Sequence, residues 1–208
     1  MALKTFVKIS TVNNLSDARY CAGMYVNLMG FNLEENNKDY TSPEKFREVT
    51  EWLSGLEYVG EFENTHPDKI LEIIKEYEGI DYLQVSEEMY LQMLVNTSFK
   101  IIWNKSISDV SELKDLIAKA DSLKSNQVTL LLESDSLKLN EEVNTLLIKL
   151  SGKCKVLLGF GLDAGHIEET LEQTGVSGIA MKGGDEIKPG LKDFDELADI
   201  LEALEIED

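Results

Sequence analysis

The sequence predicts an α/β fold, a closed (β/α)₈ or TIM barrel, in a single domain that spans residues 1–208. Short apolar runs alternate eight times with helix-like segments over 208 residues, about 26 residues per unit. Such alternation favours parallel strand pairing, and nearly continuous apolar runs indicate strands buried on both faces. No proline- or glycine-rich linker interrupts the units. Eight units favour closure into a barrel, although periodicity alone leaves a doubly wound open sheet as the alternative.

The predicted strands are short runs rich in apolar, β-branched and aromatic residues. The first six occupy residues 5–10, 25–33, 57–62, 80–85, 99–103 and 128–132. The last two lie within 154–163 and 179–185, where each apolar run ends in glycines. These two units attract most interest, because glycine lets a backbone turn sharply and approach a ligand.

The predicted helices follow from capping residues and apolar spacing. Five helices are expected to start at Asn14, Ser42-Pro43, Pro67, Ser108 and Asn140. We expect a further helix over about 87–95 and the last one over 194–204. Gly55, Gly79 and Gly152 end helices. Cys21 falls on the apolar face of the first helix, so we predict a core position, because free cysteine behaves as a small buried hydrophobe.

Composition excludes several classes of function. The net charge of −19, from 20 basic and 39 acidic residues, argues against a nucleic-acid partner and against an anionic membrane surface. Two separated cysteines give neither a disulfide framework nor a metal cluster. The first residues do not resemble a signal peptide, and no apolar run approaches the roughly 18 residues of a membrane span. We therefore expect a cytoplasmic enzyme-sized domain.

The glycine turns of the last two units predict a phosphate site. In a barrel of this class, phosphate commonly binds after strands seven and eight, where backbone N–H groups and helix N-termini face the anion. The predicted phosphate-binding residues are Gly161, Lys182, Gly183 and Gly184. The plainer alternative is two ordinary strand-to-helix turns, since short glycine loops are weak motifs.

The barrel prediction also places several polar residues near the C-terminal ends of strands, where active sites of this fold lie. They are Lys8, Ser10, Asp39, Gln84, Ser86 and Glu133. Taken singly, each could be a solvated loop end. Glu133 directly follows a buried strand and is the best candidate for acid–base chemistry. His66 and His166 lie at helix starts, where we predict surface or capping roles.

The sequence resembles the phosphoribosylanthranilate isomerase family of tryptophan biosynthesis over nearly its whole length. The supporting segments are Val7-Lys8-Ile9, Gly30-Phe31, Ser42-Pro43-Glu44-Lys45, Val59-Gly60-Glu61-Phe62, Gln84 and Pro189-Gly190 through Asp193. The resemblance implies a (β/α)₈ barrel that binds a small phosphorylated metabolite. It also implies an Amadori rearrangement that opens a ribose ring and moves a proton, without metal or cofactor.

The chain departs from the family pattern at the positions that carry the chemistry. Ser10 stands where the family has its general-base cysteine, and Glu133 where it has its general-acid aspartate. Asp39 replaces an arginine that holds the anthranilate end, and Ser86 replaces a histidine. Gly161 is kept after Phe160, whereas Ala180, Lys182 and Gly183 replace the family residues after strand eight, with Gly184 kept.

These substitutions predict weak or absent isomerase activity. A positioned acid or base contributes roughly 10²–10⁴ in rate, and a serine hydroxyl does not replace a thiolate base without activation. Lys8 shares a strand face with Ser10, so their spacing allows a serine–lysine pairing. Two hypotheses follow: a divergent isomerase with Ser10 and Glu133 as catalytic residues, or a non-catalytic or repurposed barrel that binds a sugar phosphate or a protein partner.

Overall fold

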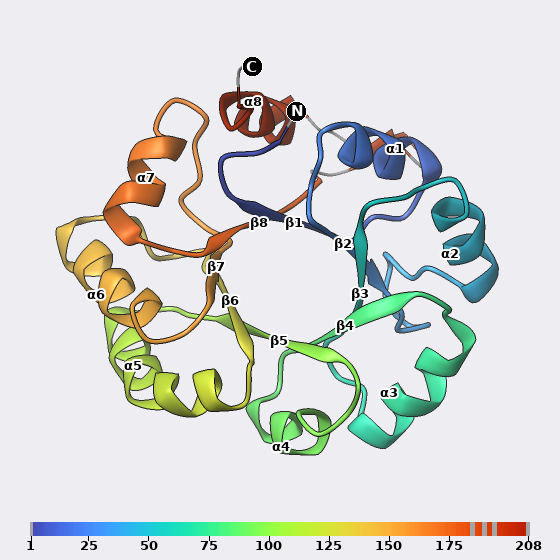
Figure 1. The fold of residues 1–208 in the computed structure, drawn as a ribbon, viewed down its shortest axis with the longest axis horizontal. Helices are drawn as coiled ribbons and strands as arrows, with labels where there is room; N and C mark the ends of the chain where they lie inside the picture. Colours follow the sequence, from blue (N-terminus) through green and yellow to red (C-terminus); the bar gives the residue numbers. More distant parts are fainter. Residues whose placement is uncertain (1, 184–185, 189–190, 193–194, 207–208) are drawn as a thin grey trace.

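The computed structural model describes residues 2–183, 186–188, 191–192 and 195–206. Strands β1 to β8 follow one another in chain order around a closed, all-parallel barrel. The helices form a ring outside this barrel (Figure 1). The predicted fold class is confirmed, and the open-sheet alternative is wrong, because β8 pairs directly with β1.

The eight barrel strands are short. They are β1 (Phe6–Ser10), β2 (Leu28–Asn32), β3 (Glu57–Phe62), β4 (Ile80–Val85), β5 (Lys100–Ser106), β6 (Thr129–Glu133), β7 (Val156–Leu158) and β8 (Gly178–Lys182). The predicted second strand began too early at Tyr25. Tyr25 has φ +57°, a left-handed conformation that a strand does not accommodate, so pairing starts only at Leu28.

The helices alternate with the strands. They are α1 (Leu15–Gly23), α2 (Pro43–Thr50), α3 (Pro67–Ile73) with the 3₁₀ turn η1 (Ile74–Glu76), the 3₁₀ turn η2 (Glu88–Tyr90) with α4 (Leu91–Leu94), α5 (Val110–Ser125), α6 (Glu141–Ser151), α7 (Ile167–Thr174) and α8 (Asp195–Ala203). Between β8 and α8 lies an antiparallel pair that was not predicted from the sequence, β9 (Glu186–Lys188) and β10 (Leu191–Lys192).

Side-chain caps start most of the predicted helices where expected. The side chains of Asn14, Ser42 and Asn140 accept backbone N–H bonds at the first turns of α1, α2 and α6. The prediction that Ser108 caps α5 is wrong. Asp109 is the N-cap, because its carboxylate accepts the Ser111 N–H at 2.7 Å, and carboxylates are favoured at the positive end of a helix.

Two apolar cores define the inside and the outside of the barrel. The larger core lies between the strands and the helices and includes Cys21, as predicted. The smaller one fills the barrel interior with Leu28, Val59, Ile102, Leu131, Leu157 and Ala180. Because strand side chains alternate between faces, residues two positions further along each strand also point inward, toward its C-terminal mouth.

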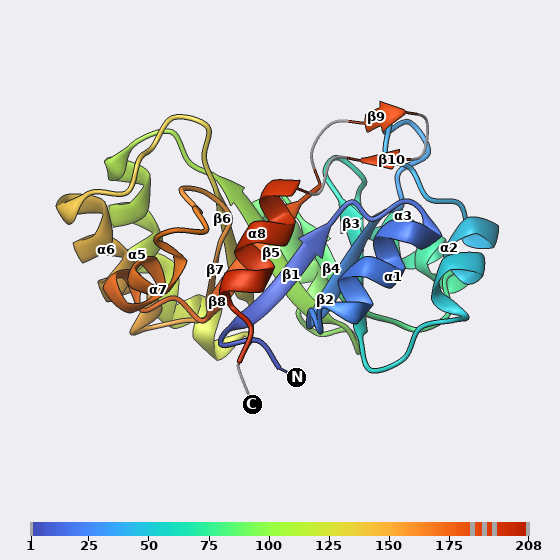
Figure 2. The same ribbon diagram turned by 90° about the horizontal axis from the view of Figure 1, so that it is seen from above.

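The two ends of the barrel are distinct. Lys4 N–H bonds to the Leu204 carbonyl at 2.9 Å, and Ile206 N–H bonds to the Ala2 carbonyl at 3.0 Å, which joins the two ends of the chain. Figure 2 shows these ends on the opposite side of the molecule from β9 and β10. No helix in the described ranges is long and apolar enough to cross a membrane.

Candidate active site

The inward-facing positions at the C-terminal mouth are mostly polar. Lys8 is the register partner of Leu28 and Ala180, two residues of the interior core, so Lys8 and Ser10 both point into the barrel. Glu133 lies two residues beyond Leu131 of the same core. Ser10 and Glu133 end β1 and β6, and the structure therefore brings both to one mouth.

A buried cluster joins Lys8, Ser10 and Glu61. The Lys8 Nζ lies 2.5 Å from Ser10 Oγ and forms an ion pair with Glu61 Oε1. The Lys8 and Glu61 side chains are 0% and 5% exposed, and Ser10 is buried. Glu61 was not predicted as a site residue. The available signal was a charged residue two positions after Val59, in a strand that is otherwise buried toward its end.

Neighbouring backbone makes room for this cluster. Glu61 lies on β3 and reaches Lys8 on β1 across Gly30 of β2. A Cβ at Gly30 would overlap the Glu61 carboxylate and come within 3.0 Å of Lys8 Nζ. The second oxygen of Glu61 accepts the Thr11 N–H at 3.0 Å. Thr11 has φ +54°, so this carboxylate also holds a left-handed turn at the end of β1.

The charges decide how Ser10 is used. An ammonium group has only donors, so Lys8 donates to Ser10 Oγ while Glu61 compensates its charge. Ser10 therefore accepts a hydrogen bond from Lys8, and its own hydroxyl proton is free to donate to a ligand. The serine–lysine spacing noted in the sequence is real, but Lys8 paired in this way is a donor to Ser10 and not an acceptor of its proton.

Glu133 lies on the opposite side of the mouth with its own support. Its Oε2 accepts a hydrogen bond from Asn104 Nδ2 at 3.0 Å, and its backbone carbonyl accepts the Ile107 N–H at 2.9 Å. A Cβ at Gly159, directly after β7, would come 3.2 Å from Glu133 Cγ and 2.9 Å from the Leu132 carbonyl. Glu133 is half-buried, so its carboxyl group is both positioned and reachable.

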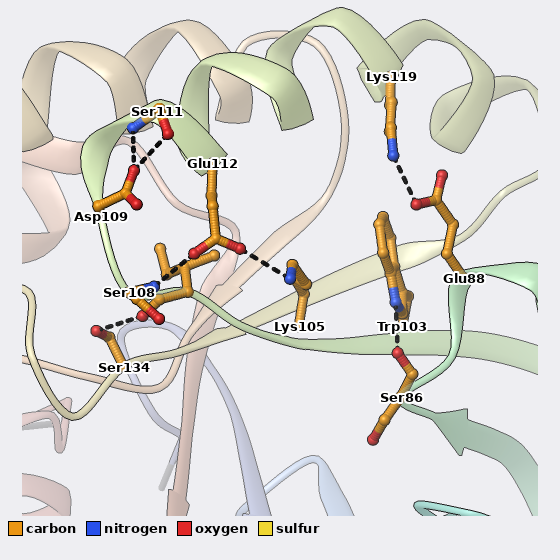
Figure 3. A network of polar contacts seen from close by, with 11 residues as sticks. Ser86, Glu88, Trp103, Lys105, Ser108, Asp109, Ser111, Glu112, Lys119 and Ser134 are labelled. Carbon is orange, nitrogen blue, oxygen red and sulfur yellow. Dashed lines mark hydrogen bonds and ion pairs between the residues drawn. The ribbon is translucent and has the colours of Figure 1, made fainter.

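A network of polar contacts joins the loops after β5 and β6 (Figure 3). Glu112 accepts the Ser108 N–H at 2.7 Å and pairs with Lys105 at 2.9 Å, and the hydrogen bond from Lys105 is the main cause of its lowered pKa. Ser134 Oγ donates to the Ile107 carbonyl at 2.7 Å. These bonds keep the backbone next to Glu133 in place.

The other predicted substrate-binding residues are less closely grouped. Gln84 is buried, is the register partner of Glu61 and Ile102, and points inward; its Oε1 has no partner among the described residues. Ser86 follows β4, and its carbonyl accepts the Trp103 indole N–H at 3.0 Å. Asp39 lies in the loop between β2 and α2, where its N–H bonds to Asn37 Oδ1 at 3.0 Å.

The predicted phosphate-binding residues lie after β7 and β8. Gly161 has φ +65°, and Leu139 would lie 2.8 Å from a Cβ there, so glycine is required. Lys182 is exposed and is the register partner of Ser10, and Gly183 follows it. Gly184 lies outside the described residues. The β9–β10 pair lies between Lys182 and α8, so among the described residues the element that follows β8 is a strand and not a helix.

The remaining titratable candidates lie elsewhere. His66 caps α3, and His166 is exposed beside Asp163. The thiols of Cys21 and Cys154 are buried, which raises their pKa to about 12 and about 11. In the described ranges, no three His, Cys, Asp or Glu side chains group as metal ligands.

A closed parallel barrel of eight strands, with polar side chains gathered at the C-terminal ends of its strands, has the architecture of (β/α)₈ enzymes. Residues 7–203 match the family model of N-(5'-phosphoribosyl)anthranilate (PRA) isomerase. The chain belongs to this isomerase family, as the sequence resemblance predicted.

Individual relatives agree with this assignment. The N-(5'-phosphoribosyl)anthranilate isomerase of Gloeothece citriformis is 26% identical over 209 residues, which cover 95% of this chain and 93% of the relative. The structure of the Thermotoga maritima enzyme superposes with a TM-score of 0.78 at 20% identity, covering 96% and 98% of the two chains. A phosphoribosyl anthranilate isomerase in complex with reduced 1-(o-carboxyphenylamino)-1-deoxyribulose 5-phosphate gives a TM-score of 0.77 at 20% identity, with the same coverage.

Proposed function

We propose that this chain isomerises N-(5'-phosphoribosyl)anthranilate, or a closely similar phosphoribosyl-amine, at the C-terminal mouth of its barrel. Family membership supports the reaction class, and the reduced 1-(o-carboxyphenylamino)-1-deoxyribulose 5-phosphate bound by a structural neighbour supports a phosphorylated ligand. The observation that carries the proposal is the half-buried Glu133 carboxyl group, held by Asn104 and facing the same mouth as Ser10.

Glu133 is the proposed proton-transfer group. Two carboxylates face inward at the mouth within the described strands, and Glu61 is engaged by Lys8 and Thr11, which leaves Glu133. As an acid, it protonates the ribose ring oxygen, and the ring opens to an iminium. As the resulting carboxylate, it removes the proton from the adjacent sugar carbon. The enolamine then tautomerises to the ketone, so atoms and protons balance.

Ser10 is proposed as the second catalytic-site residue, with a limited role. Its Oγ accepts from Lys8, so it orients the sugar as a donor and does not remove a proton. One carboxyl group then serves two proton transfers, and the loss of a separate base costs roughly 10²–10⁴ in rate. Turnover should therefore be slow.

The proposed phosphate site lies between Gly161 and the turn of Lys182, Gly183 and Gly184. Lys182 is an exposed cation at the end of β8. Lys182→Glu should weaken the binding of inorganic phosphate about tenfold in calorimetry, since it replaces attraction by repulsion. Lys155→Glu, an exposed change just before β7 at the opposite end, should leave the affinity unchanged. Equal affinity of both variants would place the anion elsewhere.

The substrate-binding proposals are Gln84, Ser86 and Asp39, together with Lys8, which is fully buried and acts on the ligand through Ser10. Asp39 puts a negative charge where the family carries an arginine, so we expect weak recognition of the anthranilate carboxylate. Gln84 has an inward amide with an unpartnered oxygen among the described residues. Ser86 borders the same mouth after β4.

Turnover of the family substrate tests the proposal. We expect the wild type to show a kcat/KM below the usual lower bound of about 10⁴ M⁻¹s⁻¹. Ser10→Cys together with Glu133→Asp should raise it about 10²-fold, because the nearby Lys8 ammonium favours a thiolate base.

Two controls complete the experiment. Ser125→Cys, an exposed change at the end of α5, should leave turnover unchanged. Glu133→Gln should abolish it. Activity that survives Glu133→Gln would remove Glu133 from the mechanism, and a wild-type value above the stated bound would show that Ser10 and Glu133 suffice.

A further inference from the structure

The Lys8–Glu61 pair is unusual because it lies inside the barrel. Both side chains are almost fully buried, and the two residues lie on strands that are not neighbours. Taking two charges out of water costs several kcal/mol per ion, and breaking such a pair leaves an uncompensated charge. An apolar pair of similar size would fill the same space without that cost, so the charges call for a role beyond packing.

We propose that Glu61 is a positioning residue for position 10 of the mouth, and that it acts through Lys8. Glu61 holds the Lys8 ammonium group against Oγ of residue 10 and neutralises its charge. Position 10 therefore faces a fixed hydrogen-bond donor inside a pair of no net charge. This inference deepens the proposed function, on which its role in the isomerisation rests.

The geometry requires a carboxylate at residue 61. One oxygen is bound by Lys8, and the other accepts the Thr11 N–H at 3.0 Å. A glutamine there would offer one acceptor oxygen and turn an NH₂ group toward a donor. The Glu61 carboxylate thus fixes the Lys8 side chain on one side of residue 10 and the Thr11 backbone on the other.

A consequence for ligand recognition follows from the charge balance. With Lys8 donating to Oγ, the Ser10 hydroxyl proton is not used in this bond and can be donated to a ligand. Since the pair behind it is neutral, Ser10 is suited to an uncharged acceptor such as a sugar oxygen. Anionic groups are left to Lys182, the register partner of Ser10 on β8.

A reporter thiol tests the coupling without any substrate. In Ser10→Cys, thiolate absorbance near 240 nm is followed from pH 5 to 9.5. Cys21 and Cys154 do not interfere, because burial raises their pKa to about 12 and about 11. We expect the new thiol to titrate below the free-cysteine value of about 8.5, since Lys8 stabilises its thiolate.

Second substitutions in this background separate the two partners. Lys8→Met should raise the thiol pKa by at least about one unit, because burial then acts without a cation. Glu61→Gln should lower it by about one unit, because the carboxylate no longer competes for the ammonium charge. If Lys8→Met misfolds, Lys8→Met with Glu61→Leu removes both charges, and replacing a buried pair by apolar residues is often neutral for stability.

Matched controls come from the other end of the same strand. Glu57 begins β3 and pairs with Lys100 at the N-terminal end of the barrel, away from the mouth, with both side chains partly exposed. Glu57→Gln and Lys100→Met should leave the thiol pKa unchanged. Lys182→Met, at the third charged residue facing position 10, should shift it less than Lys8→Met, because Lys182 is exposed and screened.

The outcomes are decisive either way. An unchanged thiol pKa in Lys8→Met, a raised one in Glu61→Gln, or an equal shift in Glu57→Gln would overturn the positioning role. Absence of turnover in every variant would count against the proposed isomerase function alone, since the titration needs no substrate.

Discussion

At the scale of single residues, Gly30 is the position on which the buried ion pair of the mouth depends. It lies on β2, directly between the strands that supply Lys8 and Glu61. Because Gly30 has no side chain, the Glu61 carboxylate and the Lys8 ammonium group can meet in the space that a Cβ would occupy. The ion pair next to Ser10 therefore depends on a residue that has no functional group of its own.

Gly30→Ala should destabilise the fold and disturb the mouth together. Its Cβ would overlap the Glu61 carboxylate, and overpacking of this kind costs typically about 1–3 kcal/mol. Urea denaturation measures the loss. Gly23→Ala is the matched control: nothing lies within 4 Å of its added Cβ at the end of α1, so its stability should stay equal or rise slightly. Equal stability of both variants would show that Glu61 moves aside at no cost.

Some residues of the mouth could be predicted from the sequence, and others could not. Ser10 and Glu133 were predicted at the mouth because each ends a strand, and the structure places them there. Glu61 was missed, because an isolated charge in a short strand looks solvent-exposed until the inward face is known. Its partnership with Lys8 joins residues 53 positions apart in sequence, which no local pattern reveals.

At the scale of elements, the connection from β5 to α5 shows how a helix is fixed next to the site. Glu112 in the first turn of α5 binds Lys105 of β5 and the backbone of Ser108, as Figure 3 shows. Asp109 caps the same turn. The turn is thus held by carboxylates at the positive end of the helix.

This turn should make stability depend on pH. The pKa of Glu112 is lowered, first by the Lys105 hydrogen bond and then by the Ser108 N–H. A folded-state pKa below the unfolded value of about 4.3 gives stability that is present above that value and is lost as pH falls through the folded pKa. Glu112→Gln should therefore be less stable than the wild type at pH 7, by up to about 1 kcal/mol.

Melting curves between pH 7 and pH 3 check this expectation. The difference between Glu112→Gln and the wild type should shrink as the pH falls below about 4. Glu72→Gln, which removes an exposed ion pair with Lys69 at 3.1 Å near the end of α3, serves as the control and should show little difference at any pH. A gap for Glu112→Gln that stays constant down to pH 3 would contradict the assignment.

Element prediction succeeded where local chemistry dominates. Asparagine and serine caps gave three helix starts correctly, because capping needs only neighbouring backbone groups. The predicted helix over 87–95 is instead a 3₁₀ turn followed by one short helix. The β9–β10 pair was missed, because its strands are only three and two residues long.

At the scale of the whole molecule, the repeat of eight strand–helix units was enough to predict closure. No single unit carries that information, since each would fit an open sheet equally well. The acidic total of 39 carboxylate residues against 20 basic ones likewise says nothing about the mouth, where a buried lysine and an exposed lysine face Ser10. Global charge describes the surface, whereas the site depends on a few inward positions.

The buried pair also bears on how the barrel finds its register. Side chains alternate along a strand, so a slip of β1 by one residue would turn Lys8 toward the helices and leave the buried Glu61 carboxylate without its cation. A lone buried charge is strongly unfavourable, typically by about 3–5 kcal/mol. Aliphatic residues tolerate such a slip far better. The Lys8–Glu61 pair therefore helps to fix the register of β1 in the barrel, because shifting β1 by one residue separates the two charges.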